Sequence, residues 1–193
     1  MASFDSVTQR GNPEVWAAPP ELTDPVAKLT QWHPMAAGGA SFRTHTLSDG
    51  ADGGLVLKKS AAMLTFGAVF LVPGLLLMGV AVSRSDGVVF AFGLLFAVAG
   101  TWAVWPRSMR FDAGLRKVML PKHSFSFSEI HAVQLLAERV AGKNRSFVSY
   151  ELNLVLHSGS RVHLIDHANH DSMRTNATRI SGLLGCPVWD TTK

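Results

Sequence analysis

The sequence predicts a helical hairpin long enough to span a membrane, joined to an α+β soluble domain of antiparallel strands closed by a C-terminal helix. Two observations carry this prediction. Uncharged apolar runs cover residues 61–82 and 88–105, and only five residues separate them. Beyond them, apolar and polar residues alternate in short segments, and the last apolar pattern, from Met173 to Leu184, has helical spacing.

Each apolar run matches the thickness of a bilayer. As helices, the 22 residues of the first run would span roughly 33 Å and the 18 of the second roughly 27 Å. The hydrocarbon core of a membrane is about 30 Å thick. Basic residues flank the pair, whereas the connecting loop holds only Arg84, offset by Asp86. By the positive-inside rule, we expect an integral membrane protein with both termini in the cytoplasm.

The composition of the two runs predicts an anchor rather than a conduit. Neither run contains Asp, Glu, Lys, Arg, His, Asn or Gln, and ion pathways, proton relays and haem sites need such groups. Small residues recur at seven-residue steps, which return to nearly the same helix face. We expect them to pack the two helices together, although one stripe would also suit a partner's helix. The helix-packing candidates are Gly67, Gly74, Gly93, Ala97 and Gly100.

The N-terminal flank predicts a tail and a short helix. Residues 1–24 lack a hydrophobic period and read as a flexible tail. A helix then starts with Asp24 as N-cap, and Val26, Leu29 and Trp32 share one of its faces. This helix lies either on the membrane surface or on the C-terminal domain. The rest of the region 25–59 predicts a β-hairpin, because residues 41–47 alternate and residues 55–59 return after a turn.

Residues 106–190 predict a compact cytoplasmic domain. Its first two strands flank a turn in which Gly114 would take the left-handed conformation. Its helix is capped by Asp171 or Asn169 and stops at Gly185. The expected strands cover residues 109–111, 115–120, 124–127, 132–140, 147–156 and 161–165.

This order of elements resembles bacterial membrane proteins that carry a pleckstrin-homology-like (PH-like) domain after two transmembrane helices. The likeness rests on Met109–Phe111, the strand FVSYELNLVL, the turn at Ser158-Gly159 and the closing helix through Leu183-Leu184-Gly185. It implies an antiparallel PH-like sheet or barrel at the bacterial inner membrane. Such domains usually have seven strands, which this chain supplies only if the hairpin at residues 41–59 completes the sheet.

A histidine-rich junction is the one candidate for metal chemistry. His163, His167 and His170 lie with two aspartates in the segment HLIDHANHD. Imidazole and carboxylate suit Zn²⁺, but the spacing matches no common zinc signature, and a polar turn with a helix cap explains the same residues. No nucleophile or phosphate-binding motif is present, so we expect no cofactor. The single cysteine, Cys186, suits the role of a small buried hydrophobe.

Cations and tryptophans next to the apolar runs predict contacts with lipid head groups. The membrane-surface candidates are Lys58, Lys59, Arg107, Arg110, Arg116 and Lys117. Trp102 and Trp105 suit an aromatic interface belt, while Trp16, Trp32 and Trp189 are candidate anchors for partners. Because this juxtamembrane position already explains the basic excess and aromatics do not interleave with it, we expect no nucleic-acid partner.

These features favour a non-enzymatic accessory or assembly subunit, whose hairpin anchors an interaction domain to integral membrane partners in the bilayer. A sensor of anionic lipid or another ligand at the membrane surface is an alternative. A metal-dependent membrane enzyme built on His163, His167 and His170 is a third hypothesis.

Overall fold

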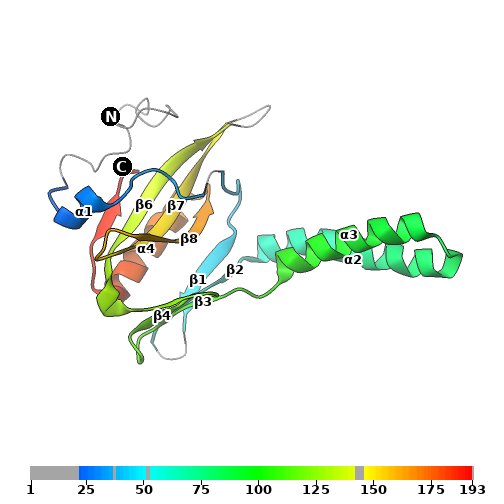
Figure 1. Cartoon of the computed structure of the whole chain (residues 1–193), viewed down its shortest axis with the longest axis horizontal. Coiled ribbons are helices and arrows are strands. Elements are labelled where there is room, and N and C mark those ends of the chain that lie inside the picture. The colour runs from blue at the N-terminus through cyan, green and yellow to red at the C-terminus, as the bar shows by residue number, and fades with distance from the viewer. Residues whose placement is uncertain (1–21, 37, 51–52, 142–145, 193) are drawn as a thin grey trace.

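The computed structural model describes residues 22–36, 38–50, 53–141 and 146–192. A β-rich body lies at one end, and a pair of long helices projects from it (Figure 1). The predicted tail, Trp16, and most of the turn expected at residues 141–145 lie outside the described residues.

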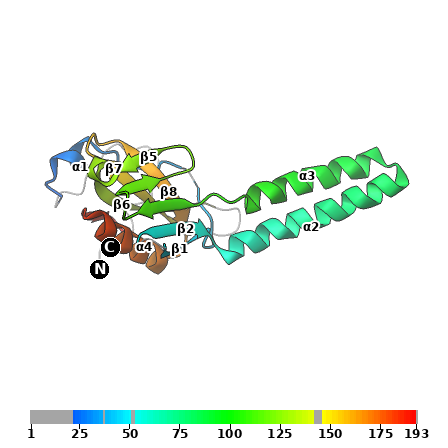
Figure 2. The ribbon, with the colours of Figure 1, turned by 90° about the horizontal axis from the view of Figure 1, so that it is seen from below.

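The projecting pair consists of α2 (Ala61–Arg84) and α3 (Gly87–Val104). Both helices are long and apolar enough to cross a membrane, as predicted. The Ser60 side chain caps α2 by accepting from Met63 N, and Asp86 caps α3 by accepting from Val88 N and Val89 N. Ser85 closes the turn between them with φ of 53°, so the two helices run antiparallel along their length (Figure 2).

The hairpin is inserted between two neighbouring strands, β2 (Leu55–Lys59) and β3 (Met109–Asp112). Only Ser60 separates β2 from α2, and residues 105–108 separate α3 from β3. The Ser60 amide donates to Thr44 O at 2.9 Å, and its hydroxyl donates to Arg43 O at 2.5 Å. Each helix of the pair is thus joined almost directly to a strand of one sheet, and not through a linker.

In the described residues the strands form two sheets and do not close into a barrel. Sheet A has the order β1-β2-β3-β4-β5 and is antiparallel throughout, with β1 at His45–Asp49, β4 at Lys117–Met119 and β5 at Ser124–Ser126. Sheet B has the order β8-β7-β6-β9, with β6 at Ile130–Val140, β7 at Phe147–Leu156 and β8 at Arg161–His167. Strands on both sides of the hairpin therefore build one sheet.

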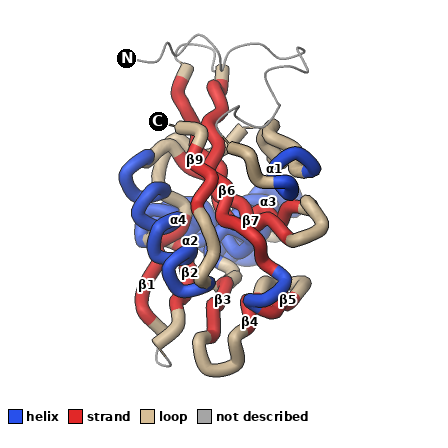
Figure 3. Tube along the Cα trace, turned by 90° about the vertical axis from the view of Figure 1, so that its left-hand side faces the viewer, coloured by secondary structure: helices blue, strands red, loops and turns tan. Residues whose placement is uncertain are grey.

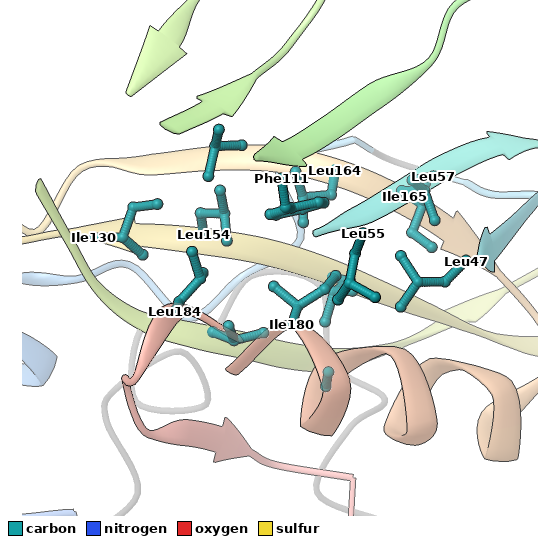
Figure 4. Close-up of a cluster of buried hydrophobic side chains, with 14 of the residues drawn as sticks. Leu47, Leu55, Leu57, Phe111, Ile130, Leu154, Leu164, Ile165, Ile180 and Leu184 are labelled. Carbon is teal, nitrogen blue, oxygen red and sulfur yellow. The ribbon is translucent and has the colours of Figure 1, made fainter. Parts of the chain in front are cut away.

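The main core lies between the two sheets and α4 (His170–Leu184). Leu47, Leu55 and Phe111 of sheet A meet Leu154 of sheet B and Ile180 of α4 in one buried cluster (Figure 4). Asn169 caps α4 by accepting from Ser172 N, and Gly185 ends it with φ of 72°. The predicted C-terminal helix and both of its ends are confirmed.

A smaller core covers the opposite face of sheet B. There Ala27 of α1 (Pro25–Leu29) and Trp32 pack on Ala132, Leu136 and other residues of β6, β7 and β9. Figure 3 shows α1 and α4 on opposite sides of β6 and β7. Of the two placements expected for the N-terminal helix, the structure thus has the one on the domain. Of the expected apolar face, Val26 and Trp32 do pack on this core, but Leu29 is 70% exposed and Ala27 is buried in its place.

Two further predictions fail locally. The turn between β3 and β4 puts Arg116, not Gly114, in the left-handed conformation, with φ of 48°, and β4 starts at Lys117 instead of Leu115. The chain also does not end with the helix. A short strand, β9 (Val188–Asp190), follows α4 and pairs parallel to β6, while a short 3-10 helix, η3 (Phe127–Glu129), leads into β6.

Candidate functional site

The small residues of the hairpin lie at the contact between α2 and α3. A Cβ atom built on Gly74 would lie 2.5 Å from Ala97 N, and one on Gly93 would lie 2.8 Å from Met78 N. A Cβ on Gly100 would collide with the backbone of Leu71. Gly67 faces Ala103 and Val104 in the same way. The structure therefore brings the two stripes together inside the hairpin, where a Cβ atom at any of these four glycines would collide with the other helix.

The end of the hairpin next to sheet A forms a distinct polar and aromatic patch, the hairpin base, made of Lys59, Ser60, Trp102, Trp105 and Arg107. The Lys59 ammonium donates to Trp102 O at 3.3 Å and to Ala103 O. It thereby satisfies carbonyls at the C-terminus of α3, where the helix dipole favours a cation. Burial, with the nearby charge of Arg107, lowers the pKa of Lys59.

Arg107 covers the aromatic side of the hairpin base. Its guanidinium carbon lies 5.5 Å from the centroid of the Trp102 ring, within range of a cation–π interaction. Trp102 and Trp105 remain 62% and 56% exposed, so their rings are available to an outside partner. This arrangement is typical of a site where an apolar environment meets a polar one.

The strand register separates the six predicted surface cations. Lys59 and Lys58 end β2 next to α2, and Arg107 follows α3. Arg110 lies within β3, 3.5 Å from Asp112. Arg116 and Lys117 lie beyond β3, where Lys117 pairs with Asp112, so they stand at the end of sheet A opposite the hairpin. Closeness in sequence misled here, because β3 carries the chain away from the hairpin.

The three candidate metal ligands do not form one group. In the described residues, no set of three His, Cys, Asp or Glu side chains is placed to hold a metal ion. His163 Nε2 lies 3.8 Å from Asp166, His167 Nδ1 accepts from Asn169 N at 3.1 Å, and His170 Nε2 lies 2.7 Å from Thr192 Oγ1. The His170 ring also stacks on Tyr150. Each histidine thus has its own local partner.

Sequence reasoning missed a second histidine next to His167. Burial, together with the charges of Lys59 and His163, lowers the pKa of His45 to about 4. Burial, with the charges of Arg43 and His45, lowers the pKa of His167 to about 4 as well. The His167 side chain is fully buried, and its Nε2 has no hydrogen-bond partner among the described residues. Both rings are therefore held neutral at pH 7.

A polar chain that sequence reasoning also missed fastens α1 to sheet B. Asp24 caps α1 by accepting from Val26 N at 2.8 Å, and its second oxygen lies 2.7 Å from His131 Nε2. His131 Nδ1 lies 3.1 Å from His157 Nδ1. Burial acts to raise the pKa of Asp24, but the hydrogen bonds from His131 and Val26 outweigh it and lower the pKa. Only the N-cap role of Asp24 had a signal in the sequence.

Two of the three tryptophans expected to anchor partners are inside the molecule. Trp32 and Trp189 are 4% and 3% exposed, and their ring centroids lie 5.6 Å apart. The Trp32 indole also donates to Ala27 O at 2.9 Å. They hold the N-terminal segment on sheet B, so the expectation of a partner contact was wrong for both.

Below this segment lies a buried network of polar side chains. The Glu151 carboxylate accepts from Met35 N and Ala36 N at 2.9–3.0 Å and from Asn153 Nδ2 at 2.7 Å. Arg161 donates to His33 O at 2.6 Å. Burial lowers the pKa of Arg161, and the charge of Glu151 opposes this effect. These groups satisfy backbone atoms of the residues after α1, which is a structural role.

A comparison with protein-family models finds no match for this chain, and neither does a comparison with curated proteins. The function is therefore argued from the geometry above.

Proposed function

We propose that this protein is a non-enzymatic accessory or assembly subunit of a larger membrane complex. Its hairpin would anchor a PH-like interaction domain at the cytoplasmic face of a bacterial inner membrane. The observation that carries the proposal is the insertion of the hairpin between the paired strands β2 and β3, through one residue on one side and four on the other.

This insertion suits a scaffold because it fixes the orientation of the body relative to the helices. A domain on a flexible linker samples many orientations, whereas two short connections from adjacent strands leave little freedom. Ser60 and Lys59 add hydrogen bonds across the connection, to Thr44 O and to the end of α3. A domain held in this way presents the same surface at a constant height above the bilayer.

The chemistry of the described residues supports a binding role over catalysis. The buried polar groups around Glu151 and Arg161 hydrogen-bond to the backbone after α1, and the histidines expected to bind a metal are separate. The outer faces of the two helices, in contrast, offer partners an exposed apolar surface. Leu76, Val82 and Leu95 are each more than 60% exposed on their outer faces, where lipid or another helix would cover them.

A PH-like identity for the body is part of this proposal. In its favour, two sheets and α4 enclose one core, and β1 and β2 extend the antiparallel sheet formed by β3 to β5. The additional β9 and the inserted hairpin are departures from the usual plan of such domains.

The test is to extract the full chain from its native membranes in a mild detergent, crosslink it and identify co-purifying proteins by mass spectrometry. We expect a complex much larger than the 20.8 kDa chain. A variant with eight Gly/Ser residues inserted after Pro106 should remain membrane-bound but lose the partner. A monomer without stoichiometric partners would refute the proposal. If the insertion variant retained the whole complex, the partner would not require a fixed orientation of the body.

A further inference from the structure

One side of the hairpin carries an apolar groove that runs into the hairpin base. It has a volume of about 460 Å³ and lies between the two helices on the side of Met78 and Thr101. The lining residues are Leu75, Met78, Leu94, Ala97, Val98, Thr101, Trp102, Trp105 and Arg107. Apart from Thr101 and Arg107, its walls are apolar side chains.

The length of the groove matches one leaflet of a bilayer. Along α3 it extends from Leu94 to Trp105, which corresponds to about 16 Å at 1.5 Å per residue. One leaflet contributes about 15 Å of hydrocarbon. An apolar chain in the groove would therefore reach from the level of the hairpin base to the middle of the membrane.

The groove ends in positive charge. Arg107 lines the end, held over the Trp102 ring, and the Lys59 ammonium donates to the carbonyl of Trp102. In the described parts of the chain, neither cation forms an ion pair with a carboxylate. Two adjacent cations without a counter-ion, next to hydrocarbon, are complementary to a ligand with an anionic head and an apolar tail.

We propose that this groove binds one anionic glycerophospholipid of the cytoplasmic leaflet. Its phosphate would accept hydrogen bonds from the Arg107 guanidinium, with Lys59 adding charge, and an acyl chain would lie along Val98 and Leu94. The inference goes beyond the accessory-subunit role and requires only that the hairpin cross the membrane. Of the six predicted membrane-surface cations, it assigns this role to Lys59 and Arg107 and not to Arg116 and Lys117, which lie at the end of sheet A opposite the hairpin.

The charge at the end of the groove favours a lipid over the helix of a partner. A phospholipid brings an anionic phosphate and an apolar chain together, which matches Arg107 and Lys59 next to the apolar walls. An apolar transmembrane helix would leave both cations without an anionic partner.

The test uses the full-length protein, delipidated in detergent and titrated with phosphatidylglycerol or phosphatidylcholine, with bound lipids counted by native mass spectrometry. We expect one phosphatidylglycerol per chain, preferred over phosphatidylcholine by about tenfold or more. Arg107→Gln should abolish this preference, whereas Arg107→Lys should retain part of it. Arg84→Gln and Arg116→Gln, which also remove exposed cations but away from the groove, serve as matched controls and should behave as wild type.

A second variant tests the groove itself. Val98 is 58% exposed, so Val98→Trp would fill the groove without disturbing the glycine contact. This variant should bind both phosphatidylglycerol and phosphatidylcholine more weakly than wild type. Equal binding of the two lipids by wild type would overturn the proposal. So would a preference that survives Arg107→Gln, or a phosphatidylglycerol affinity unchanged by Val98→Trp. Protein partners that remain bound to Arg107→Gln would show that the accessory role is independent of the lipid.

Discussion

Gly74 and Gly100 determine how closely α2 and α3 approach, because each faces the backbone of the other helix. In a lipid environment, helices associate through close packing and not through the hydrophobic effect, so these contacts carry much of the stability of the hairpin. Gly79 provides the contrast within α2, since no atom lies within 4 Å of a Cβ added there.

Gly100→Ala should separate the helices and destabilise the hairpin by about 1–3 kcal/mol, as expected for an overpacked contact. Gly79→Ala, the matched control, should be neutral or stabilising by up to about 1 kcal/mol, because Ala favours a helix. Thermal unfolding of the full chain in detergent, followed by circular dichroism, measures both. Similar melting temperatures for the two variants would mean that the glycine stripe does not set the helix spacing.

The half-buried His45 and the buried His167 predict that the fold loses stability in mild acid. Each has a folded pKa of about 4, whereas an unfolded histidine titrates near 6.5. Below about pH 6.5 these two histidines bind protons in the unfolded chain but not in the folded chain. The free energy of unfolding therefore falls as the pH drops towards 4. Above that range both states are neutral at these positions, and their contribution is complete.

We therefore expect the melting temperature of the full chain to fall by several degrees between pH 7 and pH 5, and to change little between pH 7 and pH 8 from these groups. Replacing both histidines by Asn should flatten the acid side of the profile, whatever its effect at pH 7. His123→Asn, an exposed position, is the control. A double variant with the same acid slope as wild type would rule out these two groups as the cause.

The glycine contact could be predicted from the sequence, but the histidine environment could not. A seven-residue step on an uncharged run identifies a helix face by itself, because helix geometry is local. The burial of His45 depends on β1 and β8 coming together from opposite ends of the chain, and no residue near His45 signals it. For the same reason, His163, His167 and His170 looked like one cluster although each has its own contacts.

Among the elements, the segment of α1 and Trp32 depends most on long-range contacts. It is held by Trp189, by the Asp24–His131 contact and by Glu151. Five helical residues have little stability by themselves, so the segment stays ordered only while it is docked.

Trp32→Ala should release this segment, with a cost of about 3–5 kcal/mol if the whole buried contact is lost. Trypsin should then cleave faster after Lys28, which lies on the exposed side of α1. Leu29→Ala is the matched control, since that side chain in the same helix is 70% exposed and its removal should leave cleavage slow. Equal cleavage rates in the two variants would show that Trp32 does not hold the segment.

The order of helices and strands along the chain could be predicted well from the sequence, but their arrangement in space less well. Alternation located β6 and β7, and cap residues located both ends of α4, since both signals are local. The three-residue β9 has no period of its own and exists because β6 offers it a free edge. Likewise, the distance of Arg116 from the hairpin follows from the direction of β3, which a sequence pattern does not encode.

At the scale of the whole molecule, one sheet is built from both flanks of the hairpin. Strands β1 and β2 precede α2, and β3 to β5 follow α3, so both flanks must lie on the same side of any membrane that the hairpin crosses. We expect the charge asymmetry of the hairpin ends to decide which side that is. Lys58, Lys59 and Arg107 lie at the base, against Arg84 and Asp86 at the tip, which favours a cytoplasmic body.

This topology predicts opposite labelling of the two ends of the molecule by a membrane-impermeant maleimide. In a Cys186→Ser background, Ser85→Cys at the hairpin tip should react in intact spheroplasts, whereas Leu115→Cys, 65% exposed in the β3–β4 turn, should react only after lysis. The Cys186→Ser background removes the single native thiol, although burial already raises the pKa of Cys186 to about 11 and so makes that thiol a poor nucleophile. Labelling of Leu115→Cys alone in intact spheroplasts would reverse the orientation, and labelling of both would mean that the hairpin does not cross the membrane.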